Sequence, residues 1–368
     1  MLAYGTFGIP LAASPIAFSL LALPLTGSAD DGAAIVLAMT LAQVVGAVPM
    51  SRLGSRWRTV PYLRTLIAIR AVALCAMAGL AAAGAPMWSL VTAAVVSGGV
   101  GGAAYGFLRL LLNDLVSAMR LPRALGIAAT LNEVTYATSP VLASALGAIS
   151  PVLGLAVLAC LGATPMLLVP SVPQTRRPRS AGSSLGLLTL PVLAWLACQV
   201  ACGATVAGVE IGAVSLALGF GLKAEAGFVF ALSLCLASIS GGVWVSARNR
   251  EASRGEIVGY LAVTTAGAVL VLGRWTLAST LVGAVLIGFF IAPLGTHFSI
   301  VLDRLAPPSK RAEAFALLRT AGLVGIILTS GALAVAGTGS ALAMCVALTA
   351  GATLVVASMP YWKDAGGR

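Results

Sequence analysis

The feature that most constrains this chain is a series of long apolar stretches separated by short polar breaks. A helix needs about 20 apolar residues to cross the ~30 Å hydrocarbon core of a bilayer, and the sequence contains twelve candidate stretches of this kind. They cover residues 4–25, 33–53, 60–83, 87–113, 124–148, 151–171, 186–212, 225–247, 256–273, 276–302, 312–336 and 340–359. All should be helices, because an open strand edge in lipid would leave backbone groups without partners.

Composition excludes the main alternatives to a membrane protein. Of the 368 residues, 59% are hydrophobic and 9% are charged, whereas soluble domains carry about 25% charged residues and disordered chains are poor in hydrophobic ones. The net charge of +11 comes from small basic groups between apolar stretches, not from one basic face of the kind that binds nucleic acid. We therefore expect an all-α polytopic membrane protein embedded in the lipid bilayer, with no nucleic-acid partner, cofactor or metal.

The basic residues predict the orientation, since Lys and Arg are enriched in cytoplasmic loops. Of 22 basic residues, 17 follow the even-numbered stretches or the last one, whereas the opposite loops hold Lys223 and Arg274. Both termini are therefore expected on the cytoplasmic side, and the Ala/Gly/Arg-rich composition favours a bacterial cytoplasmic membrane.

The most polar segment, VPQTRRPRSAGSSLG, separates the sixth stretch from the seventh. It predicts an N-terminal six-helix bundle at 1–172, a cytoplasmic linker at 173–185 and a C-terminal bundle with a short tail at 186–368. A weak repeat agrees with this division. GAVPMSR from Gly46 recurs as GGVWVSAR from Gly241, and LPRALGIAATL from Leu121 has a counterpart in SKRAEAFALLR from Ser309, at offsets of 195 and 188.

Two further segments complete the pattern: the loop AVPMSRLGSRWR at 47–58, and GIAATLNEVTYATSPVLAS from Gly126 in the fifth stretch. With the two parallel repeats, these segments resemble the major facilitator superfamily over nearly the whole chain. That resemblance implies twelve helices in two pseudo-symmetric six-helix bundles, transport rather than enzymatic activity, a small-molecule substrate and a protein that is competent as a monomer.

The loop at 47–58 resembles the family's G-x-L-A-D-R-x-G-R-R sequence, which helps to close the cytoplasmic gate. Arg52, Gly54 and Arg56 match it, whereas Ala47 and Ser51 replace its first Gly and its Asp. Asp114, at the end of the fourth stretch, is expected to supply the missing carboxylate. The alternative is that these arginines only set the orientation.

The fifth stretch resembles the family's antiporter sequence G-x8-G-x3-G-P-x2-G-G. Gly126 and Pro140 are in register, and small residues replace the other glycines, namely Thr135, Ser139, Ala143 and Ser144. Small residues allow close helix approach and Pro140 bends a helix. The resemblance favours export by antiport, and tight packing without directional meaning is the alternative.

Ionisable groups inside the membrane are costly and therefore indicate function. Two carboxylates, Glu133 and Glu210, are the candidates for proton coupling, because burial favours the protonated form of a carboxylate. The alternatives are a structural ion pair for Glu133 and a solvated position at the mouth for Glu210. The other candidates for the cavity are the charged or ionisable Arg70, Arg109, His297 and Arg319, the polar Tyr105, Asn132, Tyr136, Gln199 and Thr296, and the aromatic Trp195, Phe289 and Phe290.

The sequence thus predicts a secondary active transporter that uses alternating access and a proton gradient to export a small amphipathic molecule. The sequence contains no phosphate-binding loop. Proton-linked uptake of a small metabolite is an alternative, with Arg109 or Arg319 holding an anionic group. A transporter-like sensor and a membrane-embedded enzyme are further alternatives; the scattered acids and single histidine do not form a catalytic set.

Overall fold

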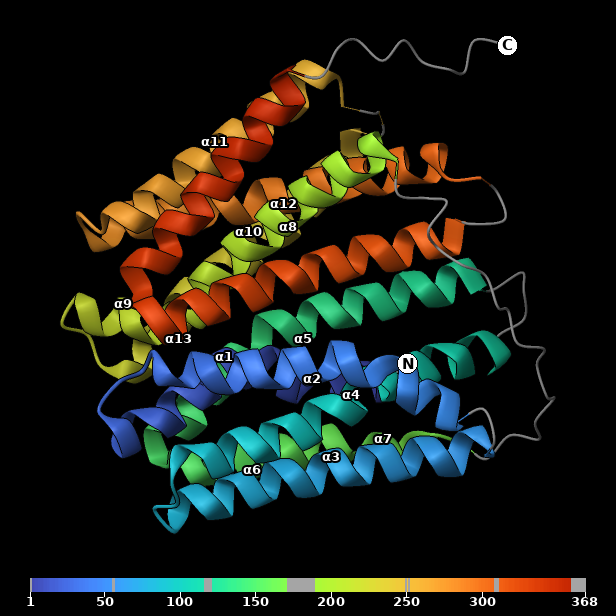
Figure 1. Ribbon diagram of the computed structural model, residues 1–368, viewed down its shortest axis with the longest axis vertical. Helices are drawn as coiled ribbons and strands as arrows, with labels where there is room; N and C mark the ends of the chain where they lie inside the picture. Colours follow the sequence, from blue (N-terminus) through green and yellow to red (C-terminus); the bar gives the residue numbers. More distant parts are fainter. Residues whose placement is uncertain are drawn as a thin grey trace. The chain divides into compact units, whose positions relative to one another are not determined.

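The computed structural model describes residues 2–54, 57–115, 121–170, 189–248, 250, 252–307 and 311–358, and every regular element within them is helical (Figure 1). The first half contains α1 (Leu2–Thr26), α2 (Asp31–Gly54), α3 (Thr59–Ala82), α4 (Met87–Leu115), α5 (Leu121–Ile149), α6 (Pro151–Ala163) and α7 (Pro165–Leu168). The single residue Thr164 separates α6 from α7. Together these two helices fill the sixth apolar stretch.

The second half contains α8 (Leu190–Ile211), α9 (Ala213–Gly219), the 3-10 helix η2 (Ala224–Gly227), α10 (Phe228–Arg248), α11 (Arg254–Gly273), α12 (Leu277–Leu305) and α13 (Arg311–Ser358). The apolar sequence after the seventh stretch forms the separate helix α9. Helix α13 is interrupted at Gly337, where φ is 74° and ψ is 177°, and Figure 1 shows a sharp bend between its two segments. These segments correspond to the last two predicted stretches.

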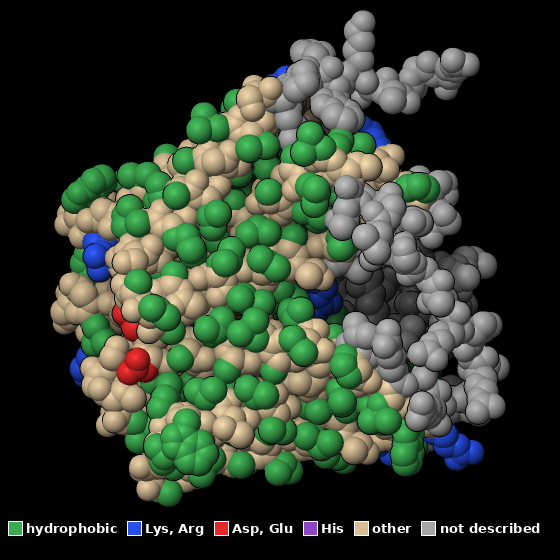
Figure 2. All heavy atoms as spheres, viewed as in Figure 1, with side chains coloured by type: hydrophobic (Ala, Val, Ile, Leu, Met, Phe, Trp, Pro, Cys, Tyr) green, Lys and Arg blue, Asp and Glu red, His purple; other side chains and the backbone are tan. Residues whose placement is uncertain are grey.

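The helices confirm a multi-pass membrane protein. Within the described part of the chain, nine helical segments are long and apolar enough to cross a membrane, and the shorter stretches at 31–47 and 134–149 are also apolar. Counting the two segments of α13 separately gives the twelve spans expected from the sequence. Figure 2 shows one face on which hydrophobic side chains are spread widely and charged ones are few, as a lipid-facing surface requires.

The chain forms two compact units. The first comprises Met1–Ser180, Val209–Cys235 and Ser330–Thr338. Its helices pair as α1 with α5, α2 with α4, and α3 with α4, and one of its cores is centred on residues such as Leu63, Ile67 and Phe107. The first unit therefore contains short segments of the second half of the sequence, next to the six helices of the first half.

The second unit comprises Ala181–Gly208, Leu236–Thr329 and Gly339–Arg368. Helices α11 and α12 pair within it, and its core includes Leu261, Leu294 and Phe298, all of which are fully buried. The predicted linker at 173–185 lies outside the described residues, so the boundary between two bundles stays a prediction.

Two glycines related by the sequence repeat occupy equivalent places. A Cβ on Gly46 in α2 would collide with the backbone of Gly99 in α4, and a Cβ on Gly241 in α10 would collide with the carbonyl of Phe289 in α12. Both positions need glycine because two membrane helices approach closely there. This shared packing supports the interpretation of the two segments as a duplication.

Candidate functional site

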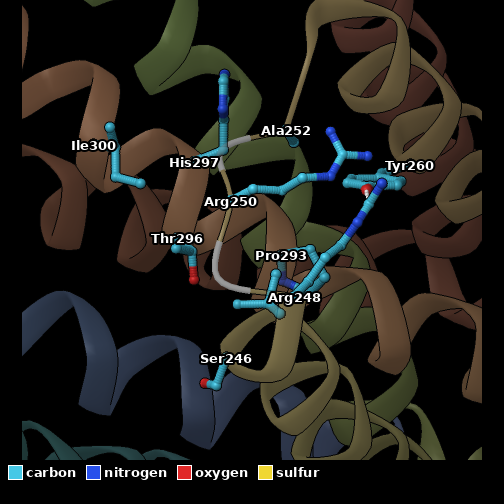
Figure 3. Close-up of a pocket in the computed structure, with 10 residues that line it drawn as sticks. Ser246, Arg248, Arg250, Ala252, Tyr260, Pro293, Thr296, His297 and Ile300 are labelled. Atoms are coloured by element: carbon cyan, nitrogen blue, oxygen red, sulfur yellow. Dashed lines mark hydrogen bonds between the residues drawn. The ribbon is translucent and has the colours of Figure 1, made fainter.

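A cavity of about 480 Å³ lies where α10 and α12 approach the start of α11 (Figure 3). We call it the cationic pocket, and it is lined by Val245, Ser246, Arg248, Arg250, Ala252, Tyr260, Pro293, Thr296, His297 and Ile300. None of these ten lining residues is acidic. Its volume falls within the range of about 300–1,000 Å³ that is typical of small-molecule sites.

Local sequence fixes the entry to α11 and hence one wall of the pocket. The Ser253 hydroxyl accepts from the backbone N–H of Glu256, and the Glu256 carboxylate accepts from the N–H of Ser253. This capping box begins the helix. Tyr260 follows Glu256 by four residues, so the two side chains lie on one face of α11.

The charged groups of the pocket form one network. The Glu256 carboxylate accepts a hydrogen bond of 2.7 Å from Arg250 and also pairs with Arg248. The Arg248 guanidinium donates to the Tyr260 hydroxyl over 2.8 Å and lies 5.0 Å from the centre of the Trp244 ring. In Figure 3, Arg248 and Arg250 both extend toward Tyr260.

Aromatic side chains pack against this network. The Tyr260 ring stacks on Phe290 with centroids 5.1 Å apart, and Trp244 contacts the rings of Tyr260 and Phe289. On the other side, His297 makes an edge contact with Trp195 of α8 at 5.2 Å. Of the residues predicted for the cavity, Thr296 and His297 line this pocket. Trp195 and Phe290 each contact one lining residue, and Phe289 contacts Phe290. Their role in a substrate cavity stays a prediction.

A second polar cluster lies within the first unit. Asp30, in the turn between α1 and α2, accepts hydrogen bonds from the Ser215 hydroxyl at 2.5 Å and from the Thr338 hydroxyl at 2.9 Å. The backbone N–H of Thr338 donates to the same carboxylate at 3.3 Å. We call Asp30, Ser215 and Thr338 the Asp30 cluster, and it joins residues that are 185 and 308 positions apart.

The remaining predicted residues are dispersed. Glu210 is partly buried in the last turn of α8, next to α9. Gln199, also in α8, lies against Gly322 of α13, and the exposed Arg319 lies in α13. Tyr136 in α5 is partly buried, and its carbonyl accepts from the Cys235 thiol at 3.4 Å. Tyr105 is partly buried in α4.

Other predicted residues lie outside what the structure describes. Arg56 falls in an undescribed segment. Six other residues lie in described helices, but their surroundings are not described, namely Arg52, Arg109, Asp114, Gly126, Asn132 and Glu133. The predicted pairing of Asp114 with Arg52 or Arg56, and the roles of Glu133 and Arg109, therefore stay predictions.

The predicted motif residues that are described have packing roles. A Cβ on Gly54 would lie 2.5 Å from the rings of Tyr62 and Phe107, so glycine lets these rings close over the end of α2. Pro140 is buried inside α5. Thr135, one of the small residues of that helix, donates to the carbonyl of Gly5 in α1 at 3.2 Å.

Buried Arg70 is the remaining deep cation of the first half. Its side chain is 6% exposed, donates to the carbonyl of Phe7 at 2.9 Å and lies 4.5 Å from the centre of the Phe7 ring. These contacts tie α3 to α1 and provide the guanidinium with both a carbonyl and an aromatic face.

The sequence did not single out Asp30, Glu256 or Tyr260 as functional residues. It used Arg248 and Arg250 only to predict the orientation of the chain in the membrane. Two signals were present. At the repeat offset of 195, Arg248 lies one residue beyond the position that corresponds to Arg52. Ser253 and Glu256 have the spacing of a capping box. No local signal identifies Asp30, since its partners are distant in sequence.

A family model matches the sequence of this chain, and several solved structures resemble its fold. The family model described as Major Facilitator Superfamily matches residues 1–330, and no curated protein matches the sequence. The fold is similar to that of the nucleoside transporter NupG carrying one substitution, with a TM-score of 0.74, 11% identity and 97% of each chain covered.

Two other solved structures are similar. A bacterial homologue of the human lysosomal transporter Spinster, in an inward-facing and occupied conformation, has a TM-score of 0.74, 13% identity and coverage of 96% of this chain and 95% of the other. A D-xylose–proton symporter has a TM-score of 0.70 and 12% identity over 96% and 95%. At these identities the likeness extends to the fold alone.

Proposed function

Because the chain belongs to the major facilitator superfamily of transporters, we propose that it exports a small amphipathic molecule in exchange for protons, by alternating access. Members of this superfamily move one bundle against the other around a central site. The contact between the two halves must therefore break and re-form during the cycle. The chain's apolar spans and its family support secondary transport across a membrane.

The Asp30 cluster is the observation that carries this mechanism. It joins the turn between α1 and α2 to α9 and to the break in α13, so it links the two halves of the sequence. The donors are two hydroxyl groups and one N–H, which exchange readily for water when a contact opens. A small polar contact of this kind is suited to a gate that closes reversibly.

Charge distribution supports an orientation for this gate. Asp30 lies in the loop after the first apolar stretch, whereas most basic residues follow the even-numbered stretches, so in our proposal the Asp30 cluster faces the outside of a bacterial cytoplasmic membrane and both termini are cytoplasmic. The cationic pocket then opens toward the cytoplasm. The protein would work as a monomer, as its family resemblance implied.

Two carboxylates are proposed to carry the coupling proton. Glu210 is partly buried and lies within an apolar span, and Glu133 is the acid of the antiporter-like helix α5. The Thr135 hydroxyl donates to α1 at 3.2 Å, which is the close packing that both the antiport hypothesis and its packing alternative predict. Proton-linked uptake remains the second candidate, and one of the structural neighbours is a D-xylose–proton symporter.

Transport in everted membrane vesicles tests the proposal. An inside-acid gradient is imposed, fluorescent lipophilic cations are added, and wild type is compared with Glu133→Gln and Glu210→Gln, with Glu225→Gln in η2 as the matched control. We expect accumulation that a protonophore abolishes and that one of the two candidate variants loses, while the control retains it. Accumulation only in right-side-out vesicles under an outside-acid gradient would instead support uptake.

A further inference from the structure

Among the residues that the structure describes, the cationic pocket combines two arginines with one neighbouring carboxylate. Arg248 and Arg250 both pair with Glu256, which is the acid that the described structure places against them. Two guanidinium groups therefore share one carboxylate. The planar guanidinium group matches the geometry of a carboxylate or a phosphate and binds either through paired hydrogen bonds.

One of the two arginines is held in place. Arg248 donates to the Tyr260 hydroxyl, lies over the Trp244 ring and pairs with Glu256, and its side chain is 27% exposed. Three different groups thus restrict its orientation. A cation that is ordered before binding loses less conformational entropy when an anion arrives.

The other arginine has more freedom. The side chain of Arg250 is 54% exposed, and Glu256 is its described partner. Exposed ion pairs contribute little stability, commonly ~0–1 kcal/mol. The Arg250 guanidinium can therefore turn from Glu256 toward an anion in the cavity at small cost.

The other lining groups suit an anion that carries a small apolar body. The Tyr260 hydroxyl accepts from Arg248, so its own hydrogen is available for donation. Val245, Pro293 and Ile300 give the cavity an apolar side. His297 of α12 also lines the cavity.

We infer that the cationic pocket binds an oxyanion, either a carboxylate or a phosphate, through Arg250, Arg248 and the Tyr260 hydroxyl. The anion belongs either to a soluble organic molecule or to a lipid headgroup, because basic pockets between membrane helices bind anionic headgroups as well. This inference depends on the pocket alone. It can fail while proton-coupled transport holds, and the reverse is also true.

Two binding measurements on the purified full chain distinguish the sources. Calorimetry in neutral detergent at constant ionic strength uses inorganic phosphate, glycerol 3-phosphate and succinate as soluble probes, with chloride as the blank. In nanodiscs, retention of phosphatidylglycerol relative to phosphatidylcholine is measured by native mass spectrometry. Binding of a soluble probe identifies a soluble ligand, and selective retention of phosphatidylglycerol identifies a headgroup.

Arg250→Gln is the main variant, and the matched control is Lys223→Gln, which removes one exposed positive charge of the first unit. Loss of a charge-assisted pair should weaken binding about tenfold in Arg250→Gln, with no comparable effect in the control. Equal losses in both variants would reduce the site to general electrostatic attraction and overturn the inference. So would the absence of binding in both measurements.

Glu256→Gln is expected to change the binding affinity in the opposite direction from Arg250→Gln. Glutamine retains the capping box that begins α11 but removes the charge that competes with the ligand for both arginines. Binding should become about threefold or more tighter, because an unpaired cation attracts an anion more strongly. A purely structural network would give weaker binding or no change, and either result would contradict the inference.

Discussion

Asp30 and Thr338 are 308 positions apart in the chain, yet the Asp30 carboxylate accepts hydrogen bonds from both the hydroxyl and the backbone N–H of Thr338. Thr338 directly follows the break at Gly337, where the second segment of α13 begins. Asp30 therefore acts as an N-cap supplied by another element, and its negative charge interacts favourably with the N-terminus of that segment. The same carboxylate holds Ser215 of α9.

Asp30→Asn is expected to loosen the gate. The substitution removes the charge and one acceptor oxygen, and hydrogen bonds to a charged group contribute ~1.5–3 kcal/mol each. Spin labels at Thr26 and Lys223, both exposed near this cluster, should give a broader and longer distance distribution in a cysteine-free background. Asp31→Asn is the control, since it removes the neighbouring charge; a similar distribution in both variants would count against the gate.

Gly337→Ala is expected to destabilise the protein by ~1–3 kcal/mol. The backbone at Gly337, with φ 74° and ψ 177°, lies in a region that only glycine adopts without strain. A Cβ would also lie 3.5 Å from a carboxylate oxygen of Asp30. Thermal unfolding in detergent should show the loss, whereas Gly339→Ala, where a Cβ meets Arg274 at 3.7 Å, should unfold close to wild type.

Gly241→Ala is expected to separate α10 from α12. Its Cβ would collide with the carbonyl of Phe289, and overpacking of this kind costs ~1–3 kcal/mol. We expect a lower unfolding temperature. We also expect the cationic pocket to open wider, so that a cysteine that replaces Ser246 is labelled faster. The neighbour Gly242, whose Cβ would lie 3.8 Å from Ala292, provides the control; equal effects at both positions would argue against a specific close approach.

Arg254→Gln is expected to fray the end of α13. Arg254 donates to the carbonyls of Val356 at 3.2 Å and Ala357 at 2.6 Å, which are among the last carbonyls of that helix and lack helical partners. A cation there also offsets the negative end of the helix dipole. Hydrogen exchange at 350–358 should become faster, and unchanged exchange relative to wild type would show that Arg254 does not cap the helix.

Much of the fold could be predicted from the sequence because lipid imposes a length on every span. The pattern of apolar stretches located all twelve spans, and the capping box explains why α11 begins at Arg254, two residues before the predicted start. The Asp30 cluster could not be predicted, because its partners meet only through tertiary packing. The sequence showed Arg248 and Arg250 as basic residues after the eighth stretch. That both pair with Glu256 could not be predicted, because it depends on the path of the chain between α10 and α11.

The break at Gly337 also bears on how the protein enters its membrane. From Thr320 to Ser358 the chain carries no charged residue, and a single glycine separates the two helical segments of α13. Neither segment has a charged loop at the break that could direct its insertion. The last two spans should therefore insert together as a hairpin, and the basic residues before α13 should determine its orientation during biogenesis.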